Sequence, residues 1–305
     1  MSNKKNIVLC APVILSSYIM TAHATENGGS IYPLGSENFT CCALPPPGLY
    51  GMLYTQHYSA DKVRDNSGNV VTAANFKVTA NAIAPRLVWI ADTEIAGGSF
   101  AFHGIFPLVD LNVKNAPPGS QHNRGLGDIT FGPAIGWHHS ENLHTVLGLD
   151  IYAPTGKYSN TDIANIGRNH WAIQPVVGIS YINPKGFNAD LKSMWTYNFA
   201  NDESFLPGVD KYQDGQELIM DYDFGWGFGN GWTAGVGGYI YKQFTDDKAD
   251  GVKVDDAKAK AFAIGPSLRY NSKNGWFVTA KYQDESQVKN RAEGGSFWIK
   301  VVAPL

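Results

Sequence analysis

The sequence has few charged residues, and past its N-terminus it has no long apolar run. Charged residues make up 17% of the 305 positions, below the roughly 25% of an average soluble protein. The formal net charge of -3 is too small to indicate binding to nucleic acid or a polybasic membrane patch. No run of 18 or more apolar residues follows the N-terminus, which excludes a membrane-spanning helix.

Cysteine is scarce too, with three in the chain. Cys10 lies within the signal peptide described below, so the mature chain is expected to keep the adjacent pair Cys41-Cys42. Two cysteines do not build a disulfide framework. Their sulfurs could close a vicinal ring. We expect no functional role for the pair, and the sequence leaves open whether it is oxidised.

The N-terminus has the features of a secretory signal peptide. Lys4 and Lys5 precede an apolar stretch at 7–20, and Ala22-His23-Ala24 forms an A-x-A cleavage site. We therefore assign residues 1–24 to a signal peptide. The mature chain is expected to keep a formal charge of about -5, because the two lysines leave.

The mature chain divides into an irregular segment and a long β-rich region. Residues 25–47 contain Gly28-Gly29, Pro33 and Pro45-Pro46-Pro47 and show no period, which predicts irregular or polyproline-like structure. Residues 48–305 contain alternating segments throughout. The organisation we predict is therefore a signal peptide (1–24), an irregular segment (25–47) and a β domain (48–305).

The alternation is most regular at 218–228, where aromatic and apolar residues oppose Asp and Gly. One face carries Leu218, Met220, Tyr222, Phe224, Trp226 and Phe228, and the other carries Ile219, Asp221, Asp223, Gly225 and Gly227. Side chains change face at every residue of a strand, so this is a strand. Gly229-Asn230 then suits a tight hairpin. An aromatic stripe opposed by small and acidic residues is typical of a barrel in lipid with a wet interior.

About twelve such strands are predicted, and the connections between them alternate in length. The strands are 48–59, 76–91, 97–112, 126–139, 143–153, 170–182, 187–199, 216–228, 231–243, 259–271, 275–285 and 293–304. Short links occur at 92–96, 139–142, 183–186, 229–230 and 271–274, and long ones at 60–75, 113–125, 154–169, 200–215, 244–258 and 286–292. Short turns on one rim and long loops on the other indicate an all-β, transmembrane, antiparallel up-and-down barrel of the bacterial outer membrane.

Two early strands fit this pattern less well. Within 76–91 the alternation changes register near Ala84-Pro85-Arg86, and a proline inside a membrane strand predicts a bulge there. Phe102 and His103 leave the faces of the third strand undecided.

Six motifs, taken in order, resemble those of outer-membrane channels in the phenol meta-pathway degradation family. They are Gly125-Leu126-Gly127-Asp128, Ala153-Pro154-Thr155-Gly156-Lys157-Tyr158, Asn165-Ile166-Gly167-Arg168-Asn169, Asp214-Gly215-Gln216-Glu217, Gly231-Trp232-Thr233-Ala234-Gly235 and Gly265-Pro266. The resemblance runs from about Pro46 to the C-terminus. It implies a twelve-stranded barrel, an N-terminal segment (25–47) folded into the lumen, and uptake of small hydrophobic or aromatic molecules. One departure is the end Pro304-Leu305, where many such barrels end on Phe or Trp.

The sequence offers little support for catalysis or metal binding. His57-Tyr58-Ser59 and His138-His139-Ser140 each place a His and a Ser on one face, as an outer-membrane lipid hydrolase requires, but no orienting third group stands out. The histidines are scattered, and the aspartates on the long loops (Asp162, Asp202, Asp246, Asp247 and Asp250) are interpreted as solvated charge rather than a Ca²⁺ site. We predict no enzyme activity, no metal and no cofactor.

The candidate functional residues are the charges that point inward, because charges at membrane depth are costly unless they face water or a partner. They are Lys192, Asp221 and Asp223 in the central strands, and Asp128, Asp150, Asp190, Arg269, Lys281 and Lys300 nearer the rims. Lys192 and Asp221 are expected to face each other on consecutive strands. The sequence leaves open whether these residues line the solute path or pair with one another and with the plug.

These observations together predict an outer-membrane channel for passive uptake of small hydrophobic or aromatic compounds. Its expected partners are the solute, membrane lipid and lipopolysaccharide, and the outer-membrane assembly machinery. The rival predictions are a lipid hydrolase, if a lipid-facing His and Ser lie close to an acid or amide, and a structural barrel with a sealed lumen.

Overall fold

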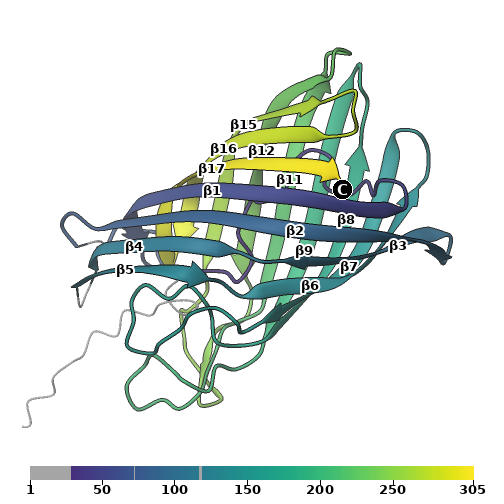
Figure 1. Ribbon diagram of the computed structural model, residues 1–305. Coiled ribbons are helices and arrows are strands. Elements are labelled where there is room, and N and C mark those ends of the chain that lie inside the picture. Colours follow the sequence, from purple (N-terminus) through teal and green to yellow (C-terminus); the bar gives the residue numbers. More distant parts are fainter. Residues whose placement is uncertain (1–28, 72, 117–118) are drawn as a thin grey trace, which may run out of the picture.

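The computed structural model describes residues 29–71, 73–116 and 119–305 (Figure 1). Its strands are β1 (Gly48–Arg64), β2 (Lys77–Ile95), β3 (Gly98–Ile105), β4 (Leu108–Ala116), β5 (Gly119–Leu126), β6 (Ile129–His138), β7 (Leu143–Ala153), β8 (Ala172–Tyr181), β9 (Phe187–Asn198), β10 (Tyr212–Gln213), β11 (Glu217–Gly227), β12 (Trp232–Gln243), β13 (Lys248–Ala249), β14 (Val252–Lys253), β15 (Lys260–Asn271), β16 (Phe277–Lys289) and β17 (Arg291–Pro304). No helix in the described residues is long and apolar enough to cross a membrane. The predicted signal peptide lies outside the described residues.

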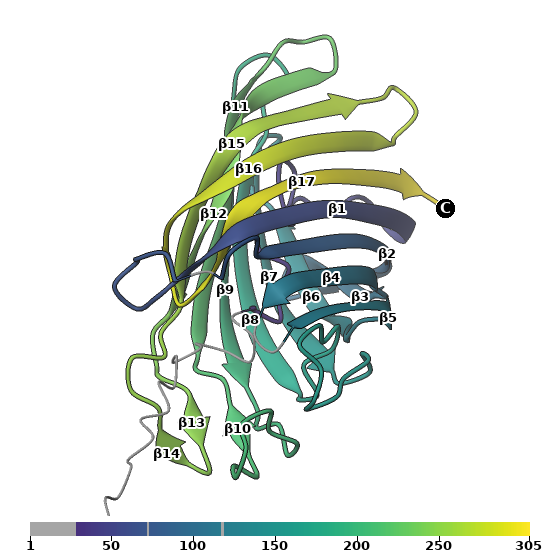
Figure 2. The same cartoon turned by 90° about the vertical axis from the view of Figure 1, so that its left-hand side faces the viewer.

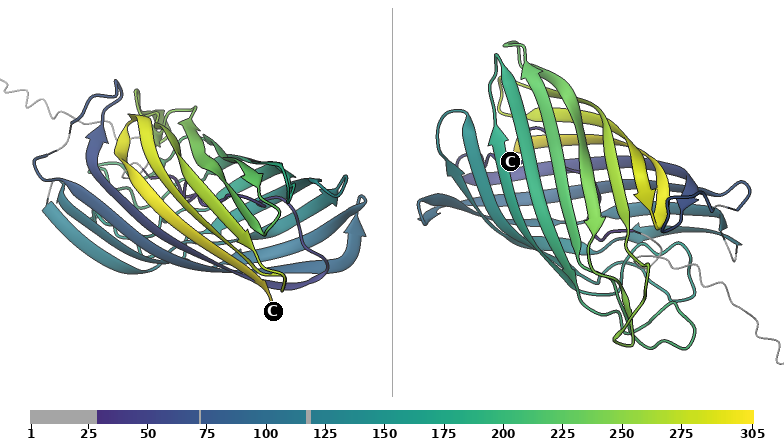
Figure 3. Two further views of the ribbon diagram at one scale, coloured as in Figure 1. Left: turned by 90° about the horizontal axis from the view of Figure 1, so that it is seen from above. Right: turned by 180° about the vertical axis from the view of Figure 1, so that it is seen from behind.

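The main sheet closes into a barrel. Each strand pairs antiparallel with its neighbours, and β1 pairs with β17 on one edge and with β2 on the other. The predicted twelve-stranded barrel is confirmed: β4 continues β3 beyond a short break, and β5 leads into β6. Figure 3 shows the tilted strands of the closed sheet from above and from behind.

The two faces of the wall differ as the alternation predicts. In β11, Asp221 is 2% exposed and Asp223 fully buried, while Phe224 and Trp226 on the opposite face are 39% and 56% exposed. A soluble protein would bury such aromatics. Here they stand on the outside, where lipid replaces a protein core.

Two of the predicted long loops are strands instead. The range 113–125 falls mostly within β4 and β5, which pair in a hairpin, and 286–292 falls mostly within β16 and β17, which are separated by Asn290 alone. Both ranges are polar because these strands extend the wall at one rim, and polarity alone does not distinguish such strands from loops. The longest loops are at 154–171, 199–216 and 244–259. The last two contain β10, β13 and β14, which form a small separate sheet (Figure 2).

The bulge predicted at Pro85 is wrong. β2 stays in continuous register with β1 from Val78 to Ile90, and its even positions face inward without a change of phase. The carbonyl of Pro85 accepts the N–H of Phe106 at 3.0 Å, so the missing N–H of Pro85 points to the same side, where β3 gives way to β4. The proline therefore disturbs the wall little. His103 faces inward and Phe102 faces outward, which assigns the two faces of the third predicted strand.

Residues 29–47, called the plug below, lie inside the barrel. Phe39, Asn38 and Cys42 are at most 2% exposed. Tyr32 and Leu34 pack in a buried cluster with wall residues that include Met194. The fold prediction of an N-terminal segment in the lumen is therefore confirmed for the described part of that segment.

Candidate functional site

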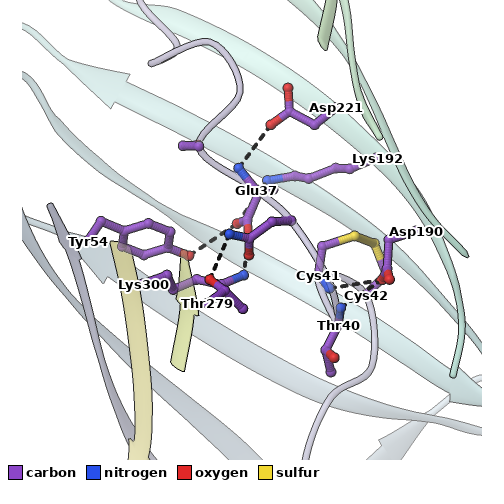
Figure 4. Close-up of polar contacts among 12 residues, drawn as sticks. Glu37, Thr40, Cys41, Cys42, Tyr54, Asp190, Lys192, Asp221, Thr279 and Lys300 are labelled. Atoms are coloured by element: carbon purple, nitrogen blue, oxygen red, sulfur yellow. Dashed lines mark hydrogen bonds and ion pairs between the residues drawn. A yellow bond between two sulfur atoms is a disulfide. The ribbon is translucent and has the colours of Figure 1, made fainter. Parts of the chain in front are cut away.

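One acid of the plug meets basic residues from three different parts of the wall. Glu37 is the single charged residue of the plug. Its Oε2 lies 3.1 Å from Lys300 Nζ, and its Oε1 lies 3.2 Å from Arg86 Nη1 and 3.5 Å from Lys192 Nζ. The hydroxyl of Tyr54 donates to the same Oε1 at 3.2 Å. Figure 4 shows Glu37 among Lys192, Lys300 and Tyr54.

The charge state of Glu37 follows from this arrangement. Burial alone would raise the pKa of this carboxyl, but Lys300, Lys192 and Arg86 outweigh burial and lower the pKa well below its usual value. Glu37 is therefore ionised at neutral pH. Because the site is buried, removal of this carboxylate would leave three cations without their shared counter-charge, which is costly.

Two wall aspartates bind the backbone of the plug. Asp221 accepts the N–H of Gly35 at 3.2 Å, the N–H of Glu37 at 3.0 Å and the hydroxyl of Tyr32 at 2.6 Å. Asp190 accepts the N–H groups of Thr40 and Cys41 at 2.9 and 3.1 Å and also bonds Ser180. These carboxylates satisfy backbone donors that an irregular buried segment would otherwise leave unpaired.

Three further predicted residues complete the contacts with the plug or with each other. Lys281 donates to the carbonyl of Glu37 at 2.6 Å and lies 3.5 Å from Asp223. Arg269 bonds Thr40 and Thr233, and its guanidinium lies 5.9 Å from the Phe39 ring. The side of the lumen formed by β9, β11 and β15–β17 therefore holds the plug through charged side chains.

All nine residues predicted to line the lumen are at most 9% exposed, but they serve different contacts. Six bind the plug: Lys192, Asp190, Asp221, Arg269, Lys281 and Lys300. Asp223 pairs with Lys281, and Asp150 bonds His103 at 2.9 Å. Asp128 instead accepts the N–H groups of Gly156 and Arg168 at 2.9 and 2.7 Å and so fixes the 154–171 loop.

The expected juxtaposition of Lys192 and Asp221 is present. The two residues are direct partners in the antiparallel register of β9 and β11, and both are buried on the inner face. Alternation places both residues on the inner face, and the pairing of β9 with β11 sets them opposite each other although a long loop, 199–216, connects the two strands.

Cys41 and Cys42 form a disulfide within the plug. The N–H of Cys42 donates to Ser180 Oγ at 3.1 Å. A Cβ at Gly178 would collide with Cys42 Sγ, so glycine leaves room for the disulfide at this point of β8. The bonded pair therefore lies against the wall next to Asp190 (Figure 4).

A cavity of about 200 Å³ lies between the plug and the opposite side of the wall. Ala80, Ala82 and Ala84 of β2 line it at successive inward positions, with Ile105 and Val109 beside them. Its polar lining residues include Glu37, Arg86, Asp128, Asp150, Arg168 and Lys192. The cavity extends to the 154–171 loop, because Ile166 and Arg168 contribute to its lining.

Sequence reasoning missed three polar residues of this site: Glu37, Arg86 and His103. Glu37 could have been found, because a lone acid in an otherwise uncharged segment of a predicted plug needs a basic partner. Arg86 was obscured by the supposed register change at Pro85. Nothing in the sequence singled out the pairing of His103 with Asp150, because the partners are on strands 47 residues apart.

The two sequence patterns considered for catalysis lie in different surroundings. On the outer face of β1 and β2, His57 Nδ1 lies 2.7 Å from Asn81 Oδ1, while no hydrogen bond joins His57 to Ser59. At the end of β6, His138 contacts His144 of β7 at 2.6 Å between their Nδ1 atoms. Within the described residues, no three His, Cys, Asp or Glu side chains are grouped to hold a metal.

The profile of the family described as the MetA pathway of phenol degradation matches residues 60–301. The chain belongs to this family. The resemblance recognised in the sequence motifs is therefore confirmed over most of the chain. Among curated protein sequences, none is significantly similar to it.

Solved structures show the same fold. An outer membrane channel from Pseudomonas putida F1 is 18% identical, with a TM-score of 0.78 over 88% of this chain and 99% of that one. The transport unit of the autotransporter AIDA-I from Escherichia coli is 11% identical, with a TM-score of 0.50 over 88% of this chain and 93% of that one. A closed antiparallel barrel with an apolar outer face is the architecture of outer-membrane proteins. This member of the phenol-degradation family is a protein of the bacterial outer membrane.

Proposed function

We propose that the protein is an outer-membrane channel for passive uptake of small hydrophobic and aromatic compounds. The observation that carries the proposal is the lumen cavity, where Ala80, Ala82 and Ala84 line a mainly apolar space beside the plug. Binding sites for small apolar molecules have this character, with few polar groups that orient the ligand. Membership of a family described by phenol degradation agrees with such a solute.

In this proposal the plug controls passage. The contacts of Glu37, Asp190 and Asp221 hold residues 29–47 across the lumen, so a solute passes along the plug or after the plug moves. No energy source or cofactor is required for diffusion down a gradient. We infer that the buried charges set the width of the path and its ion preference.

Uptake by proteoliposomes tests the proposed function directly. Vesicles that contain the mature protein should admit benzyl alcohol and toluene faster than protein-free vesicles, while a sugar of similar mass should enter much more slowly. The matched control is the same protein with Ala82→Trp, which fills the cavity. Equal entry of aromatic compounds with and without protein would reject uptake and favour a sealed structural barrel.

The contact between His57 and Asn81 keeps a lipid hydrolase as the second candidate function. It supplies the amide that orients a lipid-facing histidine, and Ser59 lies two residues along on the same face. In such an enzyme Ser59 Oγ would attack an ester carbonyl while His57 takes its proton. Ester hydrolysis by the protein in lipid micelles, lost in Ser59→Ala, would establish it. The absence of hydrolysis in the wild type would remove it.

A further inference from the structure

One side of the lumen cavity has the size and surface of a binding place for a single aromatic ring. Ala80, Ala82 and Ala84 present methyl groups at three successive inward positions of β2. The cavity volume is about 200 Å³. An engineered apolar cavity of about 150 Å³ holds benzene, so a substituted single ring fits this space.

Two basic side chains at the edge of this cavity have unused hydrogen-bond donors. Lys192 is 7% exposed, and its ammonium carries three donors. Its Nζ lies 3.5 Å from Glu37 Oε1 and 5.5 Å from the Tyr32 ring centre, but it makes no hydrogen bond to any described residue. Arg86 donates through Nη1 to Glu37 and Tyr54, while its buried Nε has no partner in the described part of the chain.

Unused donors on buried cations are uncommon, because native structures pair nearly all such groups. Glu37 cannot satisfy them all, since its Oε1 already accepts from Arg86 and Tyr54 and its Oε2 from Lys300. Asp221, the cross-strand partner of Lys192, directs its oxygens to the plug backbone and Tyr32 instead. A second carboxylate at this place would accept the free donors of both cations.

We propose that the cavity selects single-ring aromatic carboxylates, with the ring against Ala80, Ala82 and Ala84 and the carboxylate on Lys192 and Arg86. The proposal rests on the proposed function and narrows its solute class. The ligand carboxylate also competes with Glu37 for the same two cations, which leaves Lys300 as the basic partner of Glu37. Binding therefore favours the state in which the plug is held less firmly, because a ligand shifts an equilibrium by its differential affinity for the two states.

Calorimetric titration of the mature protein in lipid nanodiscs tests this selectivity. The probes are benzoate, benzyl alcohol as the neutral ring of similar size, and acetate as the carboxylate without a ring. We expect the wild type to bind benzoate about tenfold more tightly than benzyl alcohol, the effect of one charge-assisted hydrogen bond. Acetate should give no measurable heat at the same concentrations.

Variants of the cavity test separately how the aromatic ring and the carboxylate of the ligand contribute to its affinity. Lys192→Met should lower benzoate affinity about tenfold and leave benzyl alcohol unchanged, while Lys192→Arg should restore benzoate binding. Ala82→Leu should abolish binding of both aromatic probes. Lys242→Met, at an exposed lysine of β12, is the matched control. The shift in gel mobility between heated and unheated samples confirms that each barrel is assembled.

The outcomes distinguish this proposal from the broader one. Equal affinities for benzoate and benzyl alcohol, or a benzoate affinity unaffected by Lys192→Met, would overturn the carboxylate selectivity while uptake of neutral aromatics still supports the channel. Binding of acetate as tight as that of benzoate would show an anion site without a ring pocket and would also overturn it. The proposed function itself fails when proteoliposomes admit no aromatic compound at all.

Discussion

The two sides of the lumen are built differently. On the side of β9, β11 and β15–β17, long charged side chains reach the plug and leave little space. On the side of β2 and β4, alanine and branched apolar residues leave a cavity. The comparison shows that one irregular segment can be fixed by one wall and still leave room along the other.

Glu37 connects the two sides. It bonds Lys300 on one side and Arg86 on the other, so the acid that fixes the plug also limits the cavity.

Removal of Glu37 should have the largest effect, because it weakens the attachment of the plug to the wall. Glu37→Ala leaves Lys300, Lys192 and Arg86 without their shared carboxylate, and breaking a buried ion pair costs about 3–5 kcal/mol. We expect single-channel conductance in planar bilayers to rise several-fold and the plug to become sensitive to protease. Glu94→Ala, at an exposed position of β2, is the control. Unchanged conductance would show that Glu37 does not hold the plug.

Filling the cavity beside β2 and β4 should reduce solute entry without weakening the contacts that hold the plug. Ala80→Phe places a ring where the solute is proposed to lie, so entry of benzyl alcohol into proteoliposomes should fall roughly tenfold, to the level expected for a blocked pocket. Ala189→Phe, on the lipid face of β9, should leave entry unchanged. Normal entry through Ala80→Phe would place the solute path elsewhere in the lumen.

Removal of Asp221 tests the backbone contacts of the plug. Asp221→Ala leaves the N–H groups of Gly35 and Glu37 without their acceptor, at a cost of about 1–3 kcal/mol for each unpaired buried donor. Hydrogen exchange at these two amides should accelerate while exchange in β11 stays slow. Asp202→Ala, at an exposed loop position, provides the control. If exchange at both amides is unaltered, other groups hold this turn of the plug.

Charge reversal at Lys192 tests whether the buried charges also influence ions. Lys192→Glu should raise the cation-to-anion permeability ratio several-fold, because the local potential changes sign in a narrow, poorly screened space. Lys185→Glu, at a turn outside the lumen, should change the ratio little. With normal assembly, an unaltered ratio would remove Lys192 and Asp221 from the ion path.

The smallest effect expected is that of pH on the plug. The pKa of Glu37 is lowered below its usual value, so its ionic stabilisation is present above the unfolded pKa of about 4.3 and is lost only as pH falls through the lower, folded value. Because Glu37 stays ionised, its contacts should contribute no change in conductance between pH 8 and pH 5. A rise in conductance within that window would mean that another titrating group controls the plug.

The barrel and the direction of most side chains follow from the alternation in the sequence. Alternation in 218–228 placed Asp221 and Asp223 inward and Phe224 and Trp226 outward, because the period of two is a local property of any strand. The same alternation placed Lys192 and Asp221 on the inner face, while the pairing of β9 with β11 set them directly opposite each other.

The partners of the inward charges and the position of the cavity depend on how the closed barrel holds the plug. The partners of Glu37 come from β2, β9 and β17, which the closed sheet brings together around an irregular segment that has no period to read. The ranges 113–125 and 286–292 are polar strands that extend the wall at one rim. Their polarity alone predicts loops, so the strands become visible only in the pairing of the sheet. The cavity beside Ala80, Ala82 and Ala84 exists because the plug is held against the opposite wall, and no local pattern in the sequence encodes which wall holds it.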